Sequence, residues 1–361
     1  STQVRILTGG PAPMPEPLSK PLDLDRVAVW AEAAIPGFRG PVRAEKTPEG
    51  QSNPTYVLTA RSGRYVLRRK PLGPILPSAH AVEREFRVMR ALGRAPAPTG
   101  VPVPRMLAFC DDDGVIGSPF FIMEHVAGRT FVDPRCPGLT PEARTALYRA
   151  MARTLAALHR VDIAALGLTD FGRPNDYFAR QRARWTRAYR ESETEHQPEL
   201  ETLIAWLERS DPPEGPPALV HGDWRIDNLR VAPDAPRIAA VLDWELSTLG
   251  HPLADLGTQL MQWAMPPGPD GRGLAGVDRN ALGLPEDAAY AALYAAEAGY
   301  STMPDLAFPI AFAFFRMAAI LQGVKARGLA GNASNPDAAA RLGALVPEYA
   351  VRALRHLDGM A

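Results

Sequence analysis

The 361-residue sequence has few cysteines, no net charge and no long apolar run, and each absence narrows the class of protein. Only Cys110 and Cys136 occur, too few for a disulfide framework, which favours a reducing, cytoplasmic environment. Lys and Arg number 40 and Asp and Glu number 40, so the chain lacks the basic excess of nucleic-acid-binding proteins. The longest uncharged apolar run, 306–315, is too short to span a bilayer, and the first twenty residues lack a signal-peptide core. We therefore expect a globular cytoplasmic protein that neither binds nucleic acid nor inserts into a membrane.

A predicted β-hairpin carries the clearest chemical signal in the chain. Two short β-prone runs, 229–231 and 238–242, flank the turn-forming stretch A-P-D-A-P-R. In this hairpin Asn228, before the first strand, faces Asp243, after the second, with their side chains within roughly 5 Å. An amide oxygen beside a carboxylate suits Mg²⁺ better than zinc. Asp223 lies on the loop that enters the hairpin, where a carboxylate can meet a substrate hydroxyl.

The order His221-x-Asp223-x4-Asn228, followed by Asp243, resembles the catalytic loop and metal-binding aspartate of protein-kinase-like enzymes. The wording H-G-D is similar to that of aminoglycoside phosphotransferases and their choline kinase-like relatives. The continuation L-D-W-E-L-S-T-L-G-H-P-L-A-D-L most closely resembles kinase-like domains found alone in bacteria or fused to acyl-CoA dehydrogenases. The resemblance implies that Asp223 is catalytic and that Asn228 and Asp243 hold Mg²⁺. It also implies that His221 and Asp255 support the loop.

The same resemblance implies an α+β, bilobal, protein-kinase-like fold with ATP between the lobes. We expect a small N-lobe with an antiparallel sheet and one key helix, and a larger, mostly helical C-lobe. The Pro- and Gly-rich residues 1–22 predict a flexible arm, followed by the nucleotide-binding N-lobe over 23–127 and the C-lobe over 128–361.

A small polar turn, G-Q-S-N, precedes a predicted hairpin over 56–60 and 65–68. Such a turn can offer backbone N–H groups to phosphates, although a plain loop is the alternative. The resemblance places Ser52 and Asn53 over the nucleotide. Further along, Phe120 begins a buried strand that runs into the predicted lobe boundary.

Three residues at the end of that strand are candidates for contact with the adenine. The resemblance makes Met123 the gatekeeper, and the backbones of Glu124 and Val126 would meet the adenine edge. A simple core strand is the alternative, because these side chains carry no chemistry of their own.

The predicted helix over 78–93 has a carboxylate on its apolar face. Glu85 lies among apolar residues that recur every three or four positions, so it requires a cationic partner. In the strand V-L-R-R-K, the resemblance gives Arg68 the place of the kinase lysine that pairs with this Glu and holds the α- and β-phosphates. Lys70 lies on the same strand face and is the alternative, whereas Arg69 points away.

Two helices of the C-lobe carry recognisable signals. Thr140 is a predicted N-cap followed by a proline at the first helical position. A helix over 176–192 is arginine-rich, and Arg180, Arg184 and Arg187 share one face. This face is either a solvated basic surface or a docking surface for an anionic acceptor.

The resemblance implies transfer of the γ-phosphoryl group of Mg²⁺·ATP to a hydroxyl of a small-molecule acceptor. Its nearest members favour a hydroxyacyl-CoA as this acceptor, and phosphorylation of an aminoglycoside or another antibiotic is the alternative. A non-catalytic nucleotide- or acyl-CoA-binding module is a third interpretation. The intact set of Asp223, Asn228 and Asp243 argues against such a module, whereas the missing strand lysine argues for it.

Overall fold

The computed structural model describes residues 22–47, 53–72, 81–331 and 335–359. The predicted arm, except for its last residue, and the candidate Ser52 lie outside these described residues, as does the predicted start of the helix over 78–93. The chain divides into two compact units, one of residues 1–83 and 107–123, the other of residues 84–106 and 124–361. This division assigns 84–106 and 124–127 to the second unit, whereas the predicted N-lobe covered 23–127.

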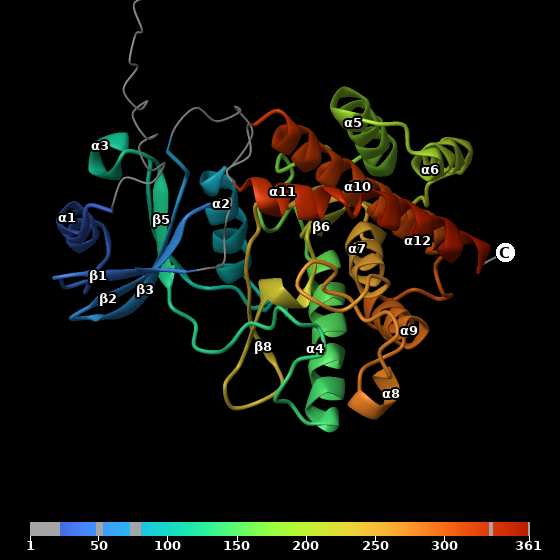
Figure 1. Cartoon of the computed structure of the whole chain (residues 1–361). Helices are drawn as coiled ribbons and strands as arrows, with labels where there is room; N and C mark the ends of the chain where they lie inside the picture. The colour runs from blue at the N-terminus through green and yellow to red at the C-terminus, as the bar shows by residue number, and fades with distance from the viewer. Residues whose placement is uncertain (1–21, 48–52, 73–80, 332–334, 360–361) are drawn as a thin grey trace, which may run out of the picture. The chain divides into compact units, whose positions relative to one another are not determined.

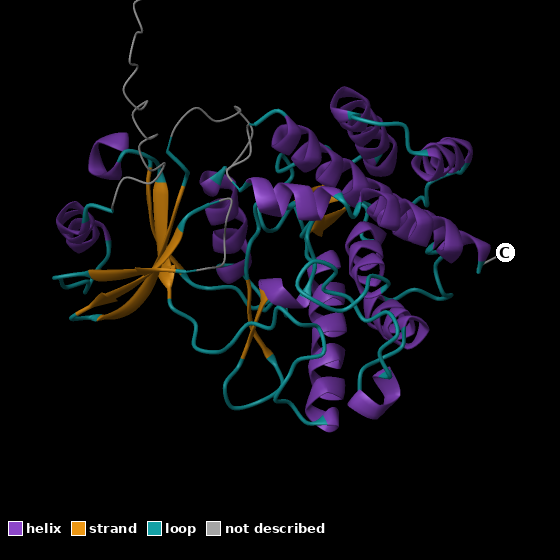
Figure 2. Cartoon of the chain, in the orientation of Figure 1, coloured by secondary structure: helices purple, strands orange, loops and turns teal. Residues whose placement is uncertain are grey.

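The first unit is built on a five-stranded sheet in the order β1-β2-β3-β5-β4 (Figure 2). Its strands are β1 (Arg43–Lys46), β2 (Thr55–Ala60), β3 (Gly63–Arg69), β4 (Met106–Cys110) and β5 (Phe120–Glu124), with helices α1 (Leu24–Ala34) and α3 (Asp113–Ile116). Strands β2 and β3 form the predicted antiparallel hairpin. Leu58 and Leu67 are completely buried in one apolar cluster with Val27 and Ala31 of α1. One face of the sheet therefore packs on α1, and side chains of opposite parity in β3 point to the other face.

The second unit is mostly helical (Figure 2). Its helices are the C-terminal part of α2 (Val82–Gly93), then α4 (Pro141–His159), α5 (Tyr177–Ser192), α6 (Pro198–Arg209), α7 (Leu253–Trp263), α8 (Arg279–Leu282), α9 (Asp287–Ala298), α10 (Ala307–Leu329), α11 (Pro336–Gly343) and α12 (Val346–Asp358). Its strands are β6 (Ala218–Val220), β7 (Leu229–Val231), β8 (Ile238–Val241) and β9 (Thr248–Gly250). Helix α4 begins as predicted, because Thr140 Oγ1 accepts a hydrogen bond from the Ala143 N–H at 3.2 Å and Pro141 follows the cap.

Helix α10 is the central helix of this unit (Figure 1). It packs against α5, α6, α7, α11 and α12. By length and composition it could cross a bilayer, but 67% of its apolar stretch is buried inside the protein. That burial is the behaviour of a core helix, in which apolar residues face other helices on most sides.

The hairpin of β7 and β8 forms, but the predicted facing of Asn228 and Asp243 is wrong by one residue. The pair that closes the turn is Val231 with Ile238, and Ala239 is then a bulge before Arg230 pairs with Ala240. Counted from the pair of Val231 and Ile238, a pair between Asn228 and Asp243 would need two extra residues in the second strand. The bulge supplies only one, so Asn228 lies opposite Leu242. Accordingly, the Leu242 N–H donates to the Asn228 carbonyl at 2.9 Å.

Candidate active site

The loop after β6 turns sharply at Gly222, just before Asp223. Gly222 has φ +84, and a Cβ on this residue would lie 2.4 Å from the Leu246 carbonyl oxygen. Both the left-handed backbone and the close approach exclude a side chain here. Glycine at this position therefore lets the chain reverse and present Asp223 at the mouth of the hairpin.

Asp255, in the first turn of α7, holds the backbone of the same loop. Its two carboxylate oxygens accept hydrogen bonds from the His221 N–H at 2.7 Å and the Gly222 N–H at 2.8 Å. His159 Nε2 donates to the same carboxylate at 3.1 Å, and the other ring nitrogen of His159 lies 2.7 Å from the Tyr294 hydroxyl. Burial alone would raise the pKa of Asp255, but the hydrogen bond and charge of His159 outweigh it and hold this pKa below its ordinary value.

The His221 ring joins the loop to the end of the hairpin. Its Nε2–H donates to the Leu242 carbonyl at 2.9 Å, and its Nδ1 accepts from the Asp223 N–H at 3.3 Å. Because Leu242 directly precedes Asp243, this ring links the backbone of both candidate carboxylates.

The Asp223 carboxylate is partly buried and has two partners, the side-chain amide of Asn228 and the guanidinium of Arg225. Asn228 Nδ2 donates to its carboxylate at 3.0 Å and to its main-chain oxygen at 2.8 Å, and Arg225 lies 3.0 Å from the same carboxylate. Burial alone would raise the pKa of Asp223, but the positive charge of Arg225 lowers it below its ordinary value, with further lowering by His221 and Arg316. Asp223 is therefore ionised at neutral pH.

Three carboxylates lie close together where the chain leaves the hairpin. One carboxylate oxygen from each of Glu85, Asp243 and Glu245 lies within 4.8 Å of the others. Asp243 has φ +60, so the chain leaves β8 in a left-handed turn at this residue. Glu245, two residues after Asp243, was not among the predicted site residues. With Asn228 Oδ1, which its Nδ2 bonds leave free to accept, these are hard oxygen donors of the kind that Mg²⁺ binds.

Arg225 is a second residue that the sequence analysis missed. Its guanidinium lies 3.0 Å from Asp223 and 3.5 Å from Asp227, and Asp227 in turn lies 3.0 Å from Arg272. Burial would lower the pKa of Arg225, but the charges of Asp223, Asp227 and Asp243 raise it. An arginine with a carboxylate two residues away on each side was the available signal, although Asp227 lies in a short 3-10 helix (Ile226–Asn228) rather than in an extended segment.

The candidate cations of the first unit lie on the two faces of β3. Arg68 is buried, and its guanidinium donates to Thr55 Oγ1 on the neighbouring strand at 3.3 Å. Arg69 has the parity of Leu67, on the face that packs on α1, whereas Lys70 is partly exposed. Arg68 belongs to the first unit and Glu85 to the second, and the ion pair between them stays a prediction.

The remaining candidates for nucleotide contact occupy the places their strands dictate. Asn53 is completely buried beside β2, and Met123 is buried at the end of β5. The Glu124 N–H donates to the Arg105 carbonyl at 3.0 Å. Val126 is partly exposed two residues later. The roles of these four residues stay predictions.

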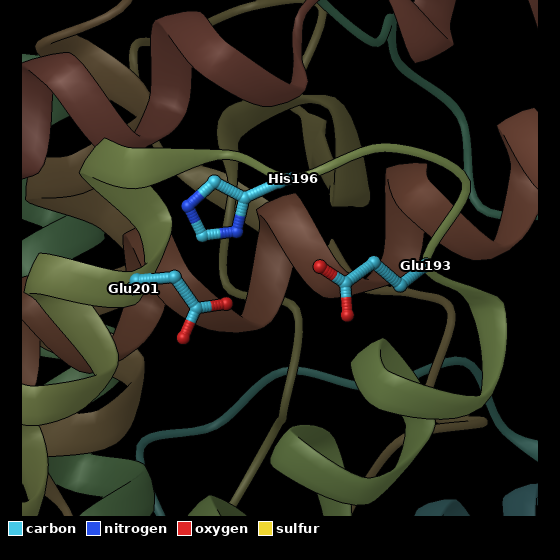
Figure 3. A group of neighbouring side chains, drawn as sticks. All are labelled: Glu193, His196 and Glu201. Atoms are coloured by element: carbon cyan, nitrogen blue, oxygen red, sulfur yellow. The ribbon is translucent and has the colours of Figure 1, made fainter.

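A separate cluster of potential metal ligands, Glu193, His196 and Glu201, lies between α5 and α6 (Figure 3). Arg190 already occupies it, because its guanidinium forms two hydrogen bonds with the Glu201 carboxylate and lies 3.6 Å from Glu193. The hydrogen bond from Arg190 lowers the pKa of Glu201. We therefore assign this cluster to surface ion pairing.

Comparisons with known proteins bear on the family and the fold of this chain. The family model described as "Phosphotransferase enzyme family" matches residues 43–303. The chain belongs to this phosphotransferase family. Its antiparallel N-terminal sheet and helical C-terminal region confirm the predicted α+β, kinase-like fold of aminoglycoside phosphotransferases.

Two similar proteins place this phosphotransferase-family chain more narrowly. It is 45% identical over 300 residues to mouse acyl-CoA dehydrogenase family member 10, covering 83% of this chain and 28% of the mouse protein. It is 43% identical to a candidate aminoglycoside phosphotransferase from Ralstonia eutropha JMP134, with a TM-score of 0.83, covering 94% of this chain and 99% of that one. The phosphotransferase-family chain spans less than half the length of the curated relatives it matches.

A more distant likeness shows the fold alone. A spectinomycin phosphotransferase, solved with ADP and spectinomycin, is 12% identical with a TM-score of 0.61, covering 93% of this chain and 98% of that one. The predicted resemblance to the aminoglycoside phosphotransferases, and to the kinase-like domains associated with acyl-CoA dehydrogenases, is therefore confirmed.

Proposed function

We propose that this chain transfers the γ-phosphoryl group of Mg²⁺·ATP to a hydroxyl group of a small molecule. The observation that carries the proposal is the position of the Asp223 carboxylate, which is fixed by Asn228 Nδ2 at 3.0 Å and by Arg225 at 3.0 Å. A carboxylate held in this way can accept a hydrogen bond from an acceptor hydroxyl and take its proton.

The residues around Asp223 supply positioning and charge. Asn228 Oδ1 and the Asp243 carboxylate would hold Mg²⁺, with Glu245 near enough to Asp243 to support it. When bound, the ion neutralises the phosphate charge that grows as the phosphoryl group moves. Asp255 and His221 hold the loop backbone in place by hydrogen bonds. The carboxylates of Asp223 and Asp243 would therefore keep their separation during turnover.

Nucleotide use is supported by similar folds, because phosphotransferases among the neighbours were solved with ADP or GDP. For this chain we propose ATP, held by Arg68, Asn53, Ser52 and the segment that contains Met123, Glu124 and Val126. The intact carboxylate and amide set argues against a binding module that lacks catalysis.

For the acceptor we propose a hydroxyacyl-CoA. Support comes from the relatives named acyl-CoA dehydrogenase family members, because a kinase joined to such a dehydrogenase would share its class of substrate. The alternative, an aminoglycoside, is supported by the description of the similar Ralstonia protein.

The test is ADP release with Mg²⁺·ATP against a panel of hydroxyacyl-CoAs, aminoglycosides, macrolides and sugars. We expect hydroxyacyl-CoAs to have the highest kcat/KM, and turnover of aminoglycosides alone would contradict the proposed acceptor. Calorimetry of Asp243→Asn tests the metal role, and we expect about ten-fold weaker Mg²⁺·ATP binding or worse. Equal affinities for wild type and variant would remove Asp243 from the metal site.

A further inference from the structure

A basic strip begins one residue from Asp223 and runs along α10 and α5. At its start, the Arg316 guanidinium of α10 donates to the Gly222 carbonyl at 3.0 Å. The positive charge of Arg316 is among those that lower the pKa of Asp223. The guanidinium of Arg316, 94 residues further along the chain, therefore contacts the loop that carries Asp223.

Trp185 of α5 connects this cation to the next. The Arg184 guanidinium lies 5.2 Å from the centre of the Trp185 ring, and that of Arg316 lies 6.0 Å from it. Both distances are in the range of cation–π attraction, which orients a guanidinium without neutralising it. Arg180 and Arg187 continue the strip, because positions i, i+4 and i+7 of a helix share a face.

Nearby carboxylates are already paired with other cations. Glu193 and Glu201 lie against Arg190, and Glu195 lies against Lys325. Within the described ranges, no carboxylate oxygen lies within 4.0 Å of the guanidinium nitrogens of the strip, whose members are Arg180, Arg184, Arg187 and Arg316. The positive charge of the strip is therefore not neutralised by a neighbouring carboxylate.

We propose that Arg184, oriented on Trp185, binds a phosphate group of the acceptor, and that Arg316 adds positive charge between this site and Asp223. Together they determine which hydroxyl compounds reach Asp223. Guanidinium groups match phosphate oxygens with two parallel hydrogen bonds, and a cationic surface repels a polycation such as an aminoglycoside. The inference rests on the proposed phosphotransfer and adds its specificity: the acceptor is an anion whose phosphate lies away from its reacting hydroxyl.

The experiment compares two thioesters of one hydroxy acid, made with coenzyme A and with pantetheine, which lacks the phosphates. In the wild type we expect kcat/KM to be about ten-fold or more higher for the CoA thioester, and Arg184→Gln to remove most of this preference by raising KM. Arg316→Gln should act in the same direction. Arg149→Gln, which removes an exposed charge on α4, is the matched control and should keep the preference.

Arg184 is the decisive position, because Arg316 also bonds to the loop and its loss could disturb Asp223 directly. Equal kcat/KM for the two thioesters in the wild type would overturn the inference, as would an Arg184→Gln variant that slows both equally. The free hydroxy acid is the third arm, and a preference for it over the CoA thioester would mean that a carboxylate is recognised and would also overturn it.

If no thioester is phosphorylated, the proposed acceptor fails while the phosphate site remains testable by binding. The probe is adenosine 3′,5′-bisphosphate, titrated by calorimetry into protein saturated with a non-hydrolysable Mg²⁺·ATP analogue. We expect binding to the wild type and Arg149→Gln, and at least ten-fold weaker binding to Arg184→Gln. No binding to the wild type would overturn the phosphate site itself.

Discussion

The side-chain amide of Asn228 donates to both the carboxylate and the main-chain oxygen of Asp223, at 3.0 Å and 2.8 Å. Because the Asn228 NH₂ group is turned toward Asp223, its Oδ1 atom remains available to coordinate a cation. One residue thus orients the candidate catalytic carboxylate and contributes to the proposed magnesium site.

Asp223→Asn should separate turnover from nucleotide binding. The variant keeps the size of the side chain but cannot accept a proton, and such a group typically contributes about 10²–10⁴-fold to the rate. We expect ADP release to fall by about 100-fold or more while calorimetry gives little change in Mg²⁺·ATP affinity. Turnover near the wild-type rate would exclude Asp223 as the proton acceptor.

Asp255→Asn should destabilise the protein and change its response to acid. In this variant an amide NH₂ replaces one acceptor oxygen and faces a buried N–H donor, which costs about 1–3 kcal/mol, so urea denaturation at pH 7 should show a lower free energy of unfolding. Since the folded pKa of Asp255 is lowered, its stabilisation is complete above the unfolded pKa of about 3.9 and is lost as pH falls through the folded pKa.

The wild type should therefore lose stability below about pH 4, and Asp255→Asn should lose less over the same interval. Parallel pH profiles for the two proteins would show that this carboxylate does not contribute to acid unfolding.

Gly222→Ala should abolish activity through a steric clash with the backbone. Gly299, which ends α9, has a matching φ of +85 but open space around its Cβ position. Gly299→Ala is therefore a control for backbone strain alone, which costs about 1–2 kcal/mol. We expect Gly299→Ala to keep ADP release and Gly222→Ala to lose both activity and more free energy of unfolding. Equal effects would mean that the loop can move away from Leu246.

Arg68→Met and Lys70→Met should differ in their effect on nucleotide binding. Arg68 is buried and bonded to Thr55, whereas Lys70 is partly exposed. We expect Arg68→Met to weaken Mg²⁺·ATP binding measured by calorimetry and Lys70→Met to change it little, with Arg68→Lys intermediate because a point charge replaces the fork. A larger effect of Lys70→Met would identify Lys70 as the cation that contacts phosphate.

The sequence by itself determined the features that depend on neighbours in the chain. The β2–β3 hairpin, the Thr140 cap of α4 and the order of His221, Asp223 and Asn228 each depend on a few consecutive residues, whose propensities and spacing are readable. The family followed from the same local motifs, and so did the α+β fold.

Only the tertiary structure decided which distant residues complete the site. Glu85 lies near Asp243, His159 bonds to both Asp255 and Tyr294, and Arg316 reaches the loop at Gly222. No periodicity encodes these contacts, because each depends on how separate helices and strands pack. The hairpin register was wrongly predicted for a related reason. The single bulge residue Ala239 in β8 shifts the pairing, and an alanine gives no sequence signal for a bulge.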